Sequence, residues 1–208
     1  MKRRVAILIS GRGSNMAALI EAARDPGFPA EVALVVSNRP GAPGLALAAR
    51  VGIPVAVIDH RQFGAVREAH EAAIDARLQE AGIDLVCLAG YMRVLTSRLV
   101  AAWEGRMLNI HPSLLPAFPG LHTHARALAT GVRLHGCTVH LVTQVVDEGP
   151  ILAQAAVPVL PGDTEAMLAG RVLIQEHRIY PMALRAFAAE TASPWAPATA
   201  SLANPVPG

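Results

Sequence analysis

Short, continuous hydrophobic runs alternate along this sequence with longer segments in which apolar residues recur every three or four positions. Runs without polar alternation are typical of strands buried on both faces of a parallel sheet, and the longer spacing is typical of amphipathic helices. The runs that we expect to form strands are residues 5–9, 32–36, 54–58, 83–89, 106–110, 137–142 and 151–160. This alternation predicts an α/β protein built on a doubly wound, mostly parallel sheet.

Helices are expected between these runs, and three of them end at a glycine. The expected helices are residues 16–24, 43–51, 63–81 and 96–104, a short helix after His124, and a last helix that opens at 161–164. Asp163 is a good N-cap for the last helix, and Pro181 should kink or end it. Gly149 and Pro150 mark a turn between the last two runs, which are therefore expected to form an antiparallel hairpin at the sheet edge.

Composition and charge limit the possible partners. The chain has 208 residues, 52% of them hydrophobic, enough for one domain at 1–190 and an uncharged, Pro/Ala-rich tail at 191–208 that should be disordered or loosely packed. The formal charge is only +2 and the basic residues are scattered, so no nucleic-acid surface is indicated. No apolar stretch is long enough to span a bilayer. Cys87 and Cys137 lie in apolar runs, which favours buried, reduced thiols and a cytoplasmic protein.

A glycine-rich turn, Gly-Arg-Gly-Ser-Asn at 11–15, connects the first strand run to the first helical pattern. Glycines let a backbone approach an anion closely, and the free N–H groups of a helix N-terminus point at it. We therefore expect a phosphate site at Gly13, Ser14 and Asn15, in which Ser14 and Asn15 are natural helix caps. A glycine-rich turn without a ligand is the alternative.

Two polar side chains, Asn109 inside the fifth run and His111 at its end, lie two residues apart and therefore share one face of a strand. An amide can donate to a developing oxyanion, and an imidazole can give or take a proton near neutral pH, which is the pairing that acyl transfer needs. Asp147, which follows the sixth run, is the candidate for orienting the imidazole. The alternative is an Asn that caps a turn and a structural His.

Two further polar features need a partner. Glu176 lies beside an apolar stripe of the last helix, and a carboxylate in such a position needs a hydrogen-bond or charge partner. A structural Arg or the neighbouring His177 is one alternative for that partner. His122 and His124 form a His-x-His pair, but no Cys or carboxylate stands nearby at ligand spacing, so we expect no metal site. Anion contact or helix capping fits these two histidines better.

The string around His111 resembles a known family. Asn-Ile-His-Pro-Ser-Leu-Leu-Pro at 109–116, followed by His135-Gly136 and by Asp-x-Gly-Pro at 147–150, is similar to the folate-dependent formyltransferases, in particular the glycinamide ribonucleotide formyltransferases of purine biosynthesis. The resemblance extends from about Val5 to Pro181. It implies a Rossmann-like formyltransferase fold, 10-formyltetrahydrofolate as co-substrate, and the amine of 5′-phosphoribosylglycinamide as acceptor, without a metal. We expect a monomer or a homodimer.

The resemblance also implies roles for single residues. The amine would attack directly, Asn109 and His111 would stabilise the tetrahedral intermediate, and Asp147 with a water would relay the proton. The residues implied for the nucleotide are Gly13, Ser14, Asn15, Gln175 and Glu176, whose carboxylate would meet the glycine amine. Those implied for folate are Arg67, Met92, Arg93, Val94, Leu95, Asn109, Thr143, Gln144, Val145, Val146 and Asp147.

Two details of the folate residues stand out. Arg67 matches the family position that meets the glutamyl carboxylate of folate, and a surface ion pair with Glu71 is the alternative. Residues 144–150 depart from the family pattern, in which many members have an acidic residue and a Leu before the Asp and Gly-Gly-Pro after it. Here the segment is Gln-Val-Val-Asp-Glu-Gly-Pro.

Four other functions fit the sequence less well. A methionyl-tRNA formyltransferase would carry a further RNA-binding domain, for which the chain ends too soon. A formyltetrahydrofolate hydrolase would have an N-terminal regulatory domain and usually a second His where Pro112 stands. A nicotinamide enzyme would need Gly or Ala in place of Met16 and an acid in place of Ser37-Asn38 after the second strand. A non-catalytic folate- or phosphate-binding module is disfavoured by the presence of Asn109, His111 and Asp147.

Overall fold

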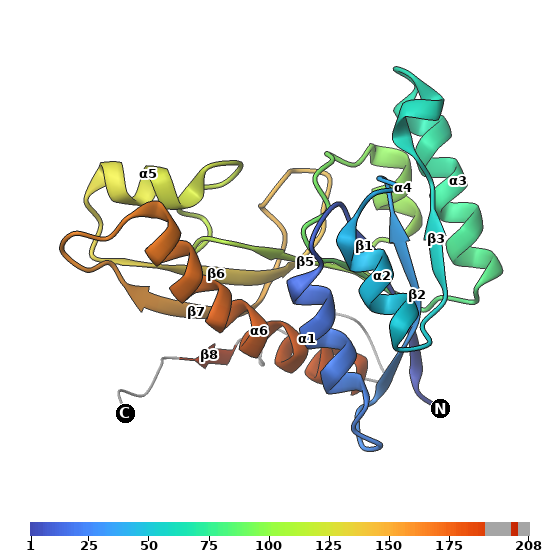
Figure 1. Cartoon of the computed structure of the whole chain (residues 1–208), viewed down its shortest axis with the longest axis horizontal. Helices are drawn as coiled ribbons and strands as arrows, with labels where there is room; N and C mark the ends of the chain where they lie inside the picture. The colour runs from blue at the N-terminus through green and yellow to red at the C-terminus, as the bar shows by residue number, and fades with distance from the viewer. Residues whose placement is uncertain (190–200, 204–208) are drawn as a thin grey trace.

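The computed structural model describes residues 1–189 and 201–203, which form one eight-stranded sheet with helices on both faces (Figure 1). The strands are β1 (Arg3–Ile9), β2 (Ala30–Ser37), β3 (Val55–Val57), β4 (Leu85–Leu88), β5 (Met107–His111), β6 (Leu134–Leu141), β7 (Ile151–Pro158) and β8 (Ser201–Ala203). The helices are α1 (Ser14–Ala23), α2 (Pro43–Arg50), a 3₁₀ turn (His60–Phe63), α3 (Arg67–Glu80), α4 (Ser97–Ala102), α5 (Thr123–Thr130) and α6 (Glu165–Ala189).

The sheet order, β3-β2-β1-β4-β5-β6-β7-β8, confirms the predicted topology. Strands β1 to β5 pair in parallel, and β5, β6 and β7 pair antiparallel, so the predicted hairpin stands at one side of the sheet. The order reverses between β1 and β4, and in such sheets ligands bind beyond the carboxyl ends of the strands on either side of the reversal. The predicted tail lies outside the described residues, except for β8, which pairs in parallel with β7.

The two faces of the sheet bury separate apolar clusters, as a doubly wound sheet requires. Alternate residues of β1 point to opposite faces: Val5, Ile7 and Ile9 pack with α1 and α6, whereas Ala6 and Leu8 pack with α3 and α4. Cys87 and Cys137 are buried and form no disulfide, and burial raises the pKa of the Cys87 thiol to about 12. Among the described helices, none is long and apolar enough to cross a membrane.

Several predicted helix ends were wrong. Helix α1 begins at Ser14 after Gly13, which adopts a left-handed conformation, and no side chain caps it, so Ser14 and Asn15 are not caps. Helix α3 begins at Arg67 because Gly64, at φ +55°, ends the preceding 3₁₀ turn. These ends depend on the positive φ angles of Gly13, before the predicted first helix, and of Gly64, inside the predicted third one, which periodicity does not reveal.

Helix α6 differs from the prediction at its start and at Pro181. Asp163 does not cap it; instead its carboxylate accepts from the Leu160 backbone and pairs with Arg171 at 2.9 Å. Pro181 does not end it, since α6 continues to Ala189. The buried residues after the proline, Ala183, Leu184 and Ala188, pack in the core, and this packing compensates for the hydrogen bond that proline removes.

A pair of histidines supports the loop after β5. His124 of α5 lies 3.2 Å from His135 of β6, from Nδ1 to Nε2, and the Phe118 ring packs edge-on against His135. Burial, assisted by the neighbouring His124 and His111, lowers the pKa of His135 to about 4. His135 is therefore neutral in the folded protein near neutral pH.

Replacing Gly136 by Ala should destabilise the protein strongly. A Cβ at Gly136 would lie 2.0 Å from the Ala155 carbonyl oxygen of β7, so the hairpin would have to open. We expect Gly136→Ala to lower the free energy of unfolding by about 2 kcal/mol or more, measured by urea denaturation. The control Gly170→Ala meets nothing within 4 Å in α6 and should raise it by about 0.5 to 1 kcal/mol. Equal stability of the two variants would contradict the close approach.

The unfolding free energy should fall as the pH drops from about 6.5, the ordinary pKa of histidine, towards the value of about 4 for His135. Folding lowers the pKa of His135, so the neutral side chain stabilises the folded state. This stabilisation is complete above the pKa that His135 has in the unfolded chain, and it is lost as the pH falls below that value. Urea denaturation at pH 7.5, 6 and 5 measures the slope. His135→Gln should have a lower free energy of unfolding than the wild type at pH 7.5. Its free energy of unfolding should also change less with pH, by up to the slope that the uptake of one proton causes. A slope identical to that of the wild type would show that His135 does not titrate in this way.

Candidate active site

The structure brings together the three predicted catalytic side chains at the carboxyl end of β5. Asn109 and His111 come from β5, and Asp147 comes from the loop between β6 and β7. The Nδ1 atom of His111 lies 3.5 Å from Oδ2 of Asp147, and both side chains are buried. A carboxylate next to a buried imidazole is the arrangement that orients a catalytic histidine.

The position of Asp147 is determined by its backbone and by one hydrogen bond. Its φ of +60° is in the left-handed region, which Asp tolerates better than most residues. The backbone N–H of Gly120 donates to Oδ2 at 2.8 Å, which connects the Asp147 loop to the loop after β5. Gly149 then lies so close to Leu141 that a Cβ would overlap its carbonyl oxygen. The Asp147 loop is thus held by the hydrogen bond from Gly120 and by the close approach of Gly149 to Leu141.

The tautomer of His111 follows from its second contact. Its Nε2 lies 3.0 Å from the carbonyl oxygen of Phe118, and a carbonyl only accepts, so Nε2 carries the proton of this hydrogen bond. Nδ1 is then the atom that faces Asp147. Phe118 itself has a left-handed backbone, φ +54°, and its ring packs against His135. The neutral His135 therefore supports the carbonyl that orients His111.

One residue of the site, His140, was missed by the sequence analysis. It lies on β6 directly opposite Asn109. Its Nδ1 donates to the Leu141 carbonyl at 2.9 Å, so in the neutral form its Nε2 accepts from Nδ2 of Asn109 at 3.1 Å. Burial lowers the pKa of His140, which favours this neutral form. A His inside an apolar run was a visible signal, but the strand register that pairs it with Asn109 is not readable from the sequence.

A second cluster joins the glycine turn to the last helix. Gly13 precedes α1, whose first backbone N–H groups have no partner within the helix. Nδ2 of Asn15 donates to Oε2 of Glu176 at 2.7 Å, and Glu176 is only 7% exposed. The partner of Glu176 is therefore an amide rather than an Arg or His177. Burial raises the pKa of Glu176, and the hydrogen bond from Asn15 acts against that shift. Gln175, the other residue expected at the nucleotide, is also buried, and its Oε1 accepts from Arg178.

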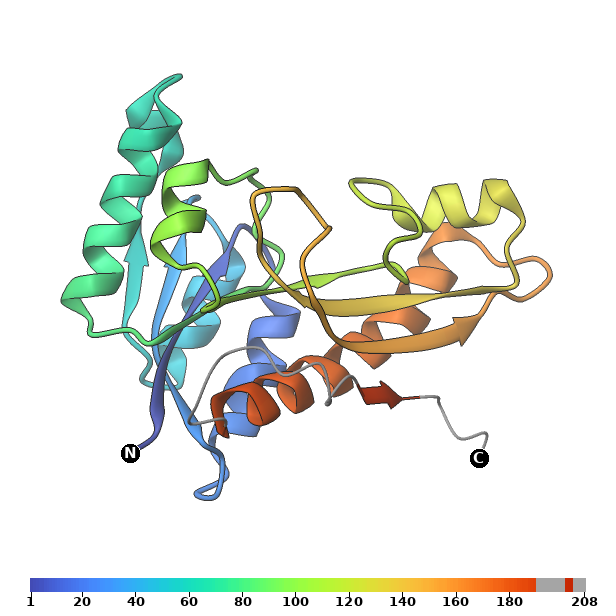
Figure 2. The same ribbon diagram turned by 180° about the vertical axis from the view of Figure 1, so that it is seen from behind.

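Apart from Arg67 in α3 and Asn109 in β5, the predicted folate residues lie on two loops that meet beside α4 (Figure 2). Met92, Arg93, Val94 and Leu95 precede α4, and Gln144 of the Asp147 loop donates to the carbonyl of Ser97 at 3.1 Å. Thr143 is turned inward on its own loop, donating to the Val145 carbonyl. Four large apolar side chains remain exposed on these loops, namely Met92, Val94, Val145 and Val146. Exposed apolar clusters of this kind mark binding surfaces.

The loop before α4 is fastened at both ends. The backbone N–H of Met92 donates to Oγ of Ser10 at 2.8 Å, and the buried carboxylate of Glu71 accepts from the backbone and hydroxyl of Thr96. Glu71 is therefore not the surface partner of Arg67 that the sequence allowed. The side chains of Arg67 and Arg93 form no hydrogen bond or ion pair with any described residue.

The His-x-His pair does not act as one unit. His122 is exposed and adopts a left-handed conformation, φ +57°, just before α5, whereas His124 contacts His135. In the part of the chain that the structure describes, no group of three or more His, Cys, Asp or Glu side chains is placed to hold a metal ion.

Comparison with known proteins agrees with this geometry. The family model described as formyl transferase matches residues 3–184. The trifunctional purine biosynthetic protein adenosine-3 of Homo sapiens is 51% identical over 190 residues, which cover 91% of this chain and 19% of that protein. The chain thus spans about a fifth of the length of that relative.

Two relatives match over most of both chains. The phosphoribosylglycinamide formyltransferase of Escherichia coli (strain K12) is 44% identical over 184 residues, which cover 88% of this chain and 86% of that protein. The crystal structure of phosphoribosylglycinamide formyltransferase from Brucella melitensis has 60% identity and a TM-score of 0.87, covering 93% of this chain and 99% of that one. The chain therefore belongs to the formyl transferase family and, within it, to the phosphoribosylglycinamide formyltransferases.

Proposed function

We propose that this protein transfers the formyl group of 10-formyltetrahydrofolate to the amine of 5′-phosphoribosylglycinamide, a step of purine biosynthesis. The observation that carries the proposal is the cluster of Asn109, His111, His140 and Asp147 at the carboxyl end of β5. Family membership supports the choice of donor and acceptor. The exposed apolar side chains on the two loops beside α4 support a flat, partly apolar donor.

The reaction begins when the neutral amine attacks the formyl carbon. A new carbon–nitrogen bond forms, and the carbonyl electron pair moves onto oxygen. The amide of Asn109 and the protonated imidazole of His111 donate to this oxyanion, and one such donor is worth about 3 kcal/mol in the barrier. The tetrahedral intermediate then collapses and breaks the bond to the folate nitrogen. A water held by Asp147 carries the proton from the attacking nitrogen to the leaving nitrogen.

The two supporting histidines determine which atoms are available for this step. Because Nε2 of His140 accepts one N–H of Asn109, the other N–H of that amide is free for the oxyanion. His111 has both nitrogens in contact, with Phe118 at 3.0 Å and with Asp147 at 3.5 Å. For His111 to donate to the oxyanion, one of these contacts must give way when the substrates bind, and the contact with Asp147 is the longer.

The acceptor nucleotide would be held at its two ends. Its phosphate would accept from the backbone N–H groups at Gly13, Ser14 and Asn15, where the helix dipole favours negative charge. Its glycine amine would donate to Glu176, which Asn15 keeps in place and which Gln175 adjoins. A buried acceptor at the amine keeps the nitrogen lone pair oriented for attack.

The remaining expectations concern the folate and the surroundings of the enzyme. Arg67 would meet the glutamyl carboxylate of the donor. The residues that would surround its ring system are Met92, Arg93, Val94, Leu95, Thr143, Gln144, Val145 and Val146. The chemistry uses no metal and no nucleic acid. We expect the enzyme to act in the cytoplasm as a monomer or a homodimer.

Replacing Asp147 by Asn should abolish most of the formyl transfer. The substitution preserves shape but removes the negative charge beside His111 and the base that holds the relay water, so kcat should fall by about 10²- to 10⁴-fold. The assay follows the release of tetrahydrofolate by ultraviolet absorbance, with and without 5′-phosphoribosylglycinamide. The control Glu104→Gln, at the exposed end of α4, should keep the wild-type rate.

The same assay separates the competing functions. Release that requires the nucleotide and collapses in Asp147→Asn supports the transferase. Release without the nucleotide indicates a hydrolase. Tight binding of folate or nucleotide without any release of tetrahydrofolate indicates a binding module. That outcome would refute the proposed function.

Glu176→Gln should weaken the reaction of the nucleotide while leaving folate binding unchanged. The substituted amide has no negative charge to accept the hydrogen bond from the amine of the nucleotide. Its own NH₂ group can also face the NH₂ group of Asn15, and two donors form no hydrogen bond. We expect kcat/KM for the nucleotide to fall by about 10- to 100-fold, as for a lost hydrogen bond to a charged group. Initial rates over a range of nucleotide concentrations measure this effect, with Glu21→Gln on the exposed face of α1 as control. An equal loss of folate affinity would contradict the assignment.

A further inference from the structure

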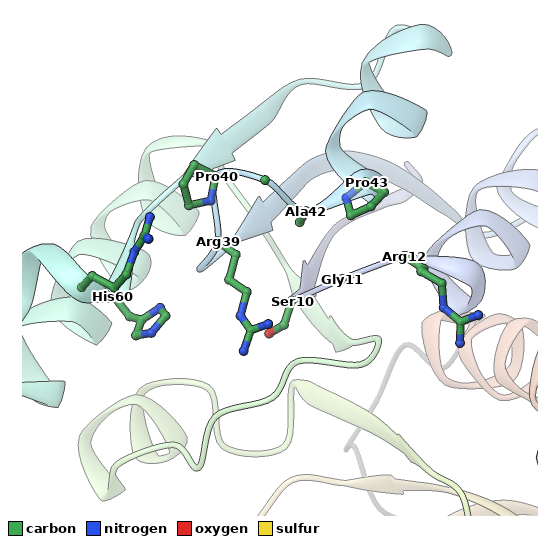
Figure 3. Close-up of a pocket in the computed structure, with 10 residues that line it drawn as sticks. Ser10, Gly11, Arg12, Arg39, Pro40, Ala42, Pro43 and His60 are labelled. Carbon is green, nitrogen blue, oxygen red and sulfur yellow. The ribbon is translucent and has the colours of Figure 1, made fainter. Parts of the chain in front are cut away.

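Two exposed arginines beside the sheet have different surroundings. Arg39 extends into a pocket of about 590 Å³ beyond the carboxyl ends of β1, β2 and β3 (Figure 3), and its side chain forms no hydrogen bond or ion pair with any described residue. The guanidinium group of Arg126, on α5, instead donates to the carbonyl of Pro119 and, at 3.4 Å, to that of Leu121. Arg126 therefore holds the loop after β5, which also contacts His111.

Three consecutive residues of this loop carry a contact to each of His111 and Asp147. The carbonyl of Phe118 accepts from Nε2 of His111 at 3.0 Å. The backbone N–H of Gly120 donates to Oδ2 of Asp147 at 2.8 Å. Pro119, whose carbonyl binds Arg126, stands between these two residues. A displacement of Pro119 would therefore disturb the partner of His111 and the partner of Asp147 together.

A single peptide group connects Arg126 to Asp147. The carbonyl of Pro119 and the N–H of Gly120 belong to the same planar unit, so a cation that fixes the oxygen also fixes the direction of the N–H. Hydrogen bonds in such a chain polarise one another, and a charged donor on the carbonyl makes the N–H a stronger donor to the carboxylate. Arg126 thus acts on Asp147 without touching it.

The backbone of this loop needs support from outside. Phe118 and His122 have left-handed conformations, with φ angles of +54° and +57°, which non-glycine residues rarely adopt. Such conformations persist only where surrounding contacts hold them. The Phe118 ring has two such contacts, the guanidinium carbon of Arg126 at 5.6 Å and the ring of His135 at 5.8 Å from its centre. Arg126 therefore supports both the ring of Phe118 and the backbone that follows it.

Helix α5, which carries Arg126, is itself anchored to the rest of the site. The hydroxyl of the buried Thr123 donates to the carbonyl of Pro112 at 2.7 Å, directly after His111. Arg126 lies one turn further along the same helix, where its side chain is exposed. The guanidinium group thus projects from a fixed helix, and its removal leaves no buried cavity.

We propose that Arg126 is a positioning residue of the formyl transfer, which holds Asp147 and His111 in place through the peptide group between Pro119 and Gly120. This inference rests on the proposed function, since it gives Arg126 a part in that reaction. Arg126 is not among the residues assigned to either substrate, so its removal should lower the turnover rate and leave substrate binding unchanged. Direct contact of the exposed guanidinium group with an anionic substrate is the alternative that the test must separate.

The test compares three variants at two exposed arginines. Arg126→Met keeps the aliphatic stem but removes the donors, so kcat should fall by about 10-fold, because small displacements of reacting groups are costly, while KM for both substrates stays within twofold. Arg126→Lys keeps a cation that can reach one carbonyl and should recover part of the loss. Arg133→Met removes an exposed arginine before β6 and should keep the wild-type kcat. A wild-type kcat in Arg126→Met would overturn the proposal, and so would a loss confined to KM.

A double-mutant cycle separates positioning from general loosening of the fold. If Arg126 acts through Asp147, Arg126→Met should lower kcat by no more than about threefold in a protein that already carries Asp147→Asn. The same 10-fold loss in both backgrounds would show that Arg126 acts independently of Asp147 and would overturn the proposal.

A spectroscopic measurement keeps the proposal separate from turnover. In protein with ¹⁵N-labelled histidines, the NMR signals of the His111 ring are those missing from His111→Gln, and they report the hydrogen bond at Nε2. These signals should shift in Arg126→Met and stay unchanged in Arg133→Met; unchanged signals in Arg126→Met would overturn the proposal. Absence of formyl transfer by the wild type would refute the proposed function, but the ring signals would still decide whether Arg126 orients His111.

Discussion

The candidate active site depends on the register in which β5 and β6 pair. This antiparallel pairing places Asn109 opposite His140 and His111 opposite Thr138. A shift by one residue would turn every side chain of one strand to the other face, and the contact between Asn109 and His140 would disappear. On the other side of β6, Gly136 permits the close approach of the Ala155 carbonyl of β7, because it has no Cβ. The pairing of β5 with β6 thus determines which hydrogen of the Asn109 amide remains free.

Electrostatics in the site follow from burial of the supporting histidines. Burial lowers the pKa of His140 and of His135, so both favour the neutral form. Asp147 lies 3.5 Å from Nδ1 of His111 and 3.8 Å from Nε2 of His140, so His111 is the closer of the two imidazoles. The neutral histidines act as hydrogen-bond partners that fix orientation, and the carboxylate supplies the charge. Positioning and charge are therefore divided between different side chains, the neutral histidines and Asp147.

The sequence predicted those parts of the structure that depend on local patterns. Buried runs identified the strands, and the spacing of Asn109 and His111 predicted that these two side chains share one strand, which the structure has as β5. What it missed depends on contacts between distant segments: the hydrogen bond between His140 and Asn109, and the buried Glu71 that accepts from Thr96. Helix ends were also missed, because Gly13 and Gly64 adopt left-handed conformations whose effect on the neighbouring turn has no periodicity.

The hydrogen bond between Asn15 and Glu176 joins residues separated by 161 positions. During synthesis, Asn15 leaves the ribosome long before Glu176 exists, so the half of the site on α1 must wait for α6. Until then, the face of β1 that α6 covers in the finished protein stays open to solvent. A nascent chain therefore completes this pair only after α6 has been synthesised, and chains that stop before α6 expose apolar surface of the kind that chaperones bind.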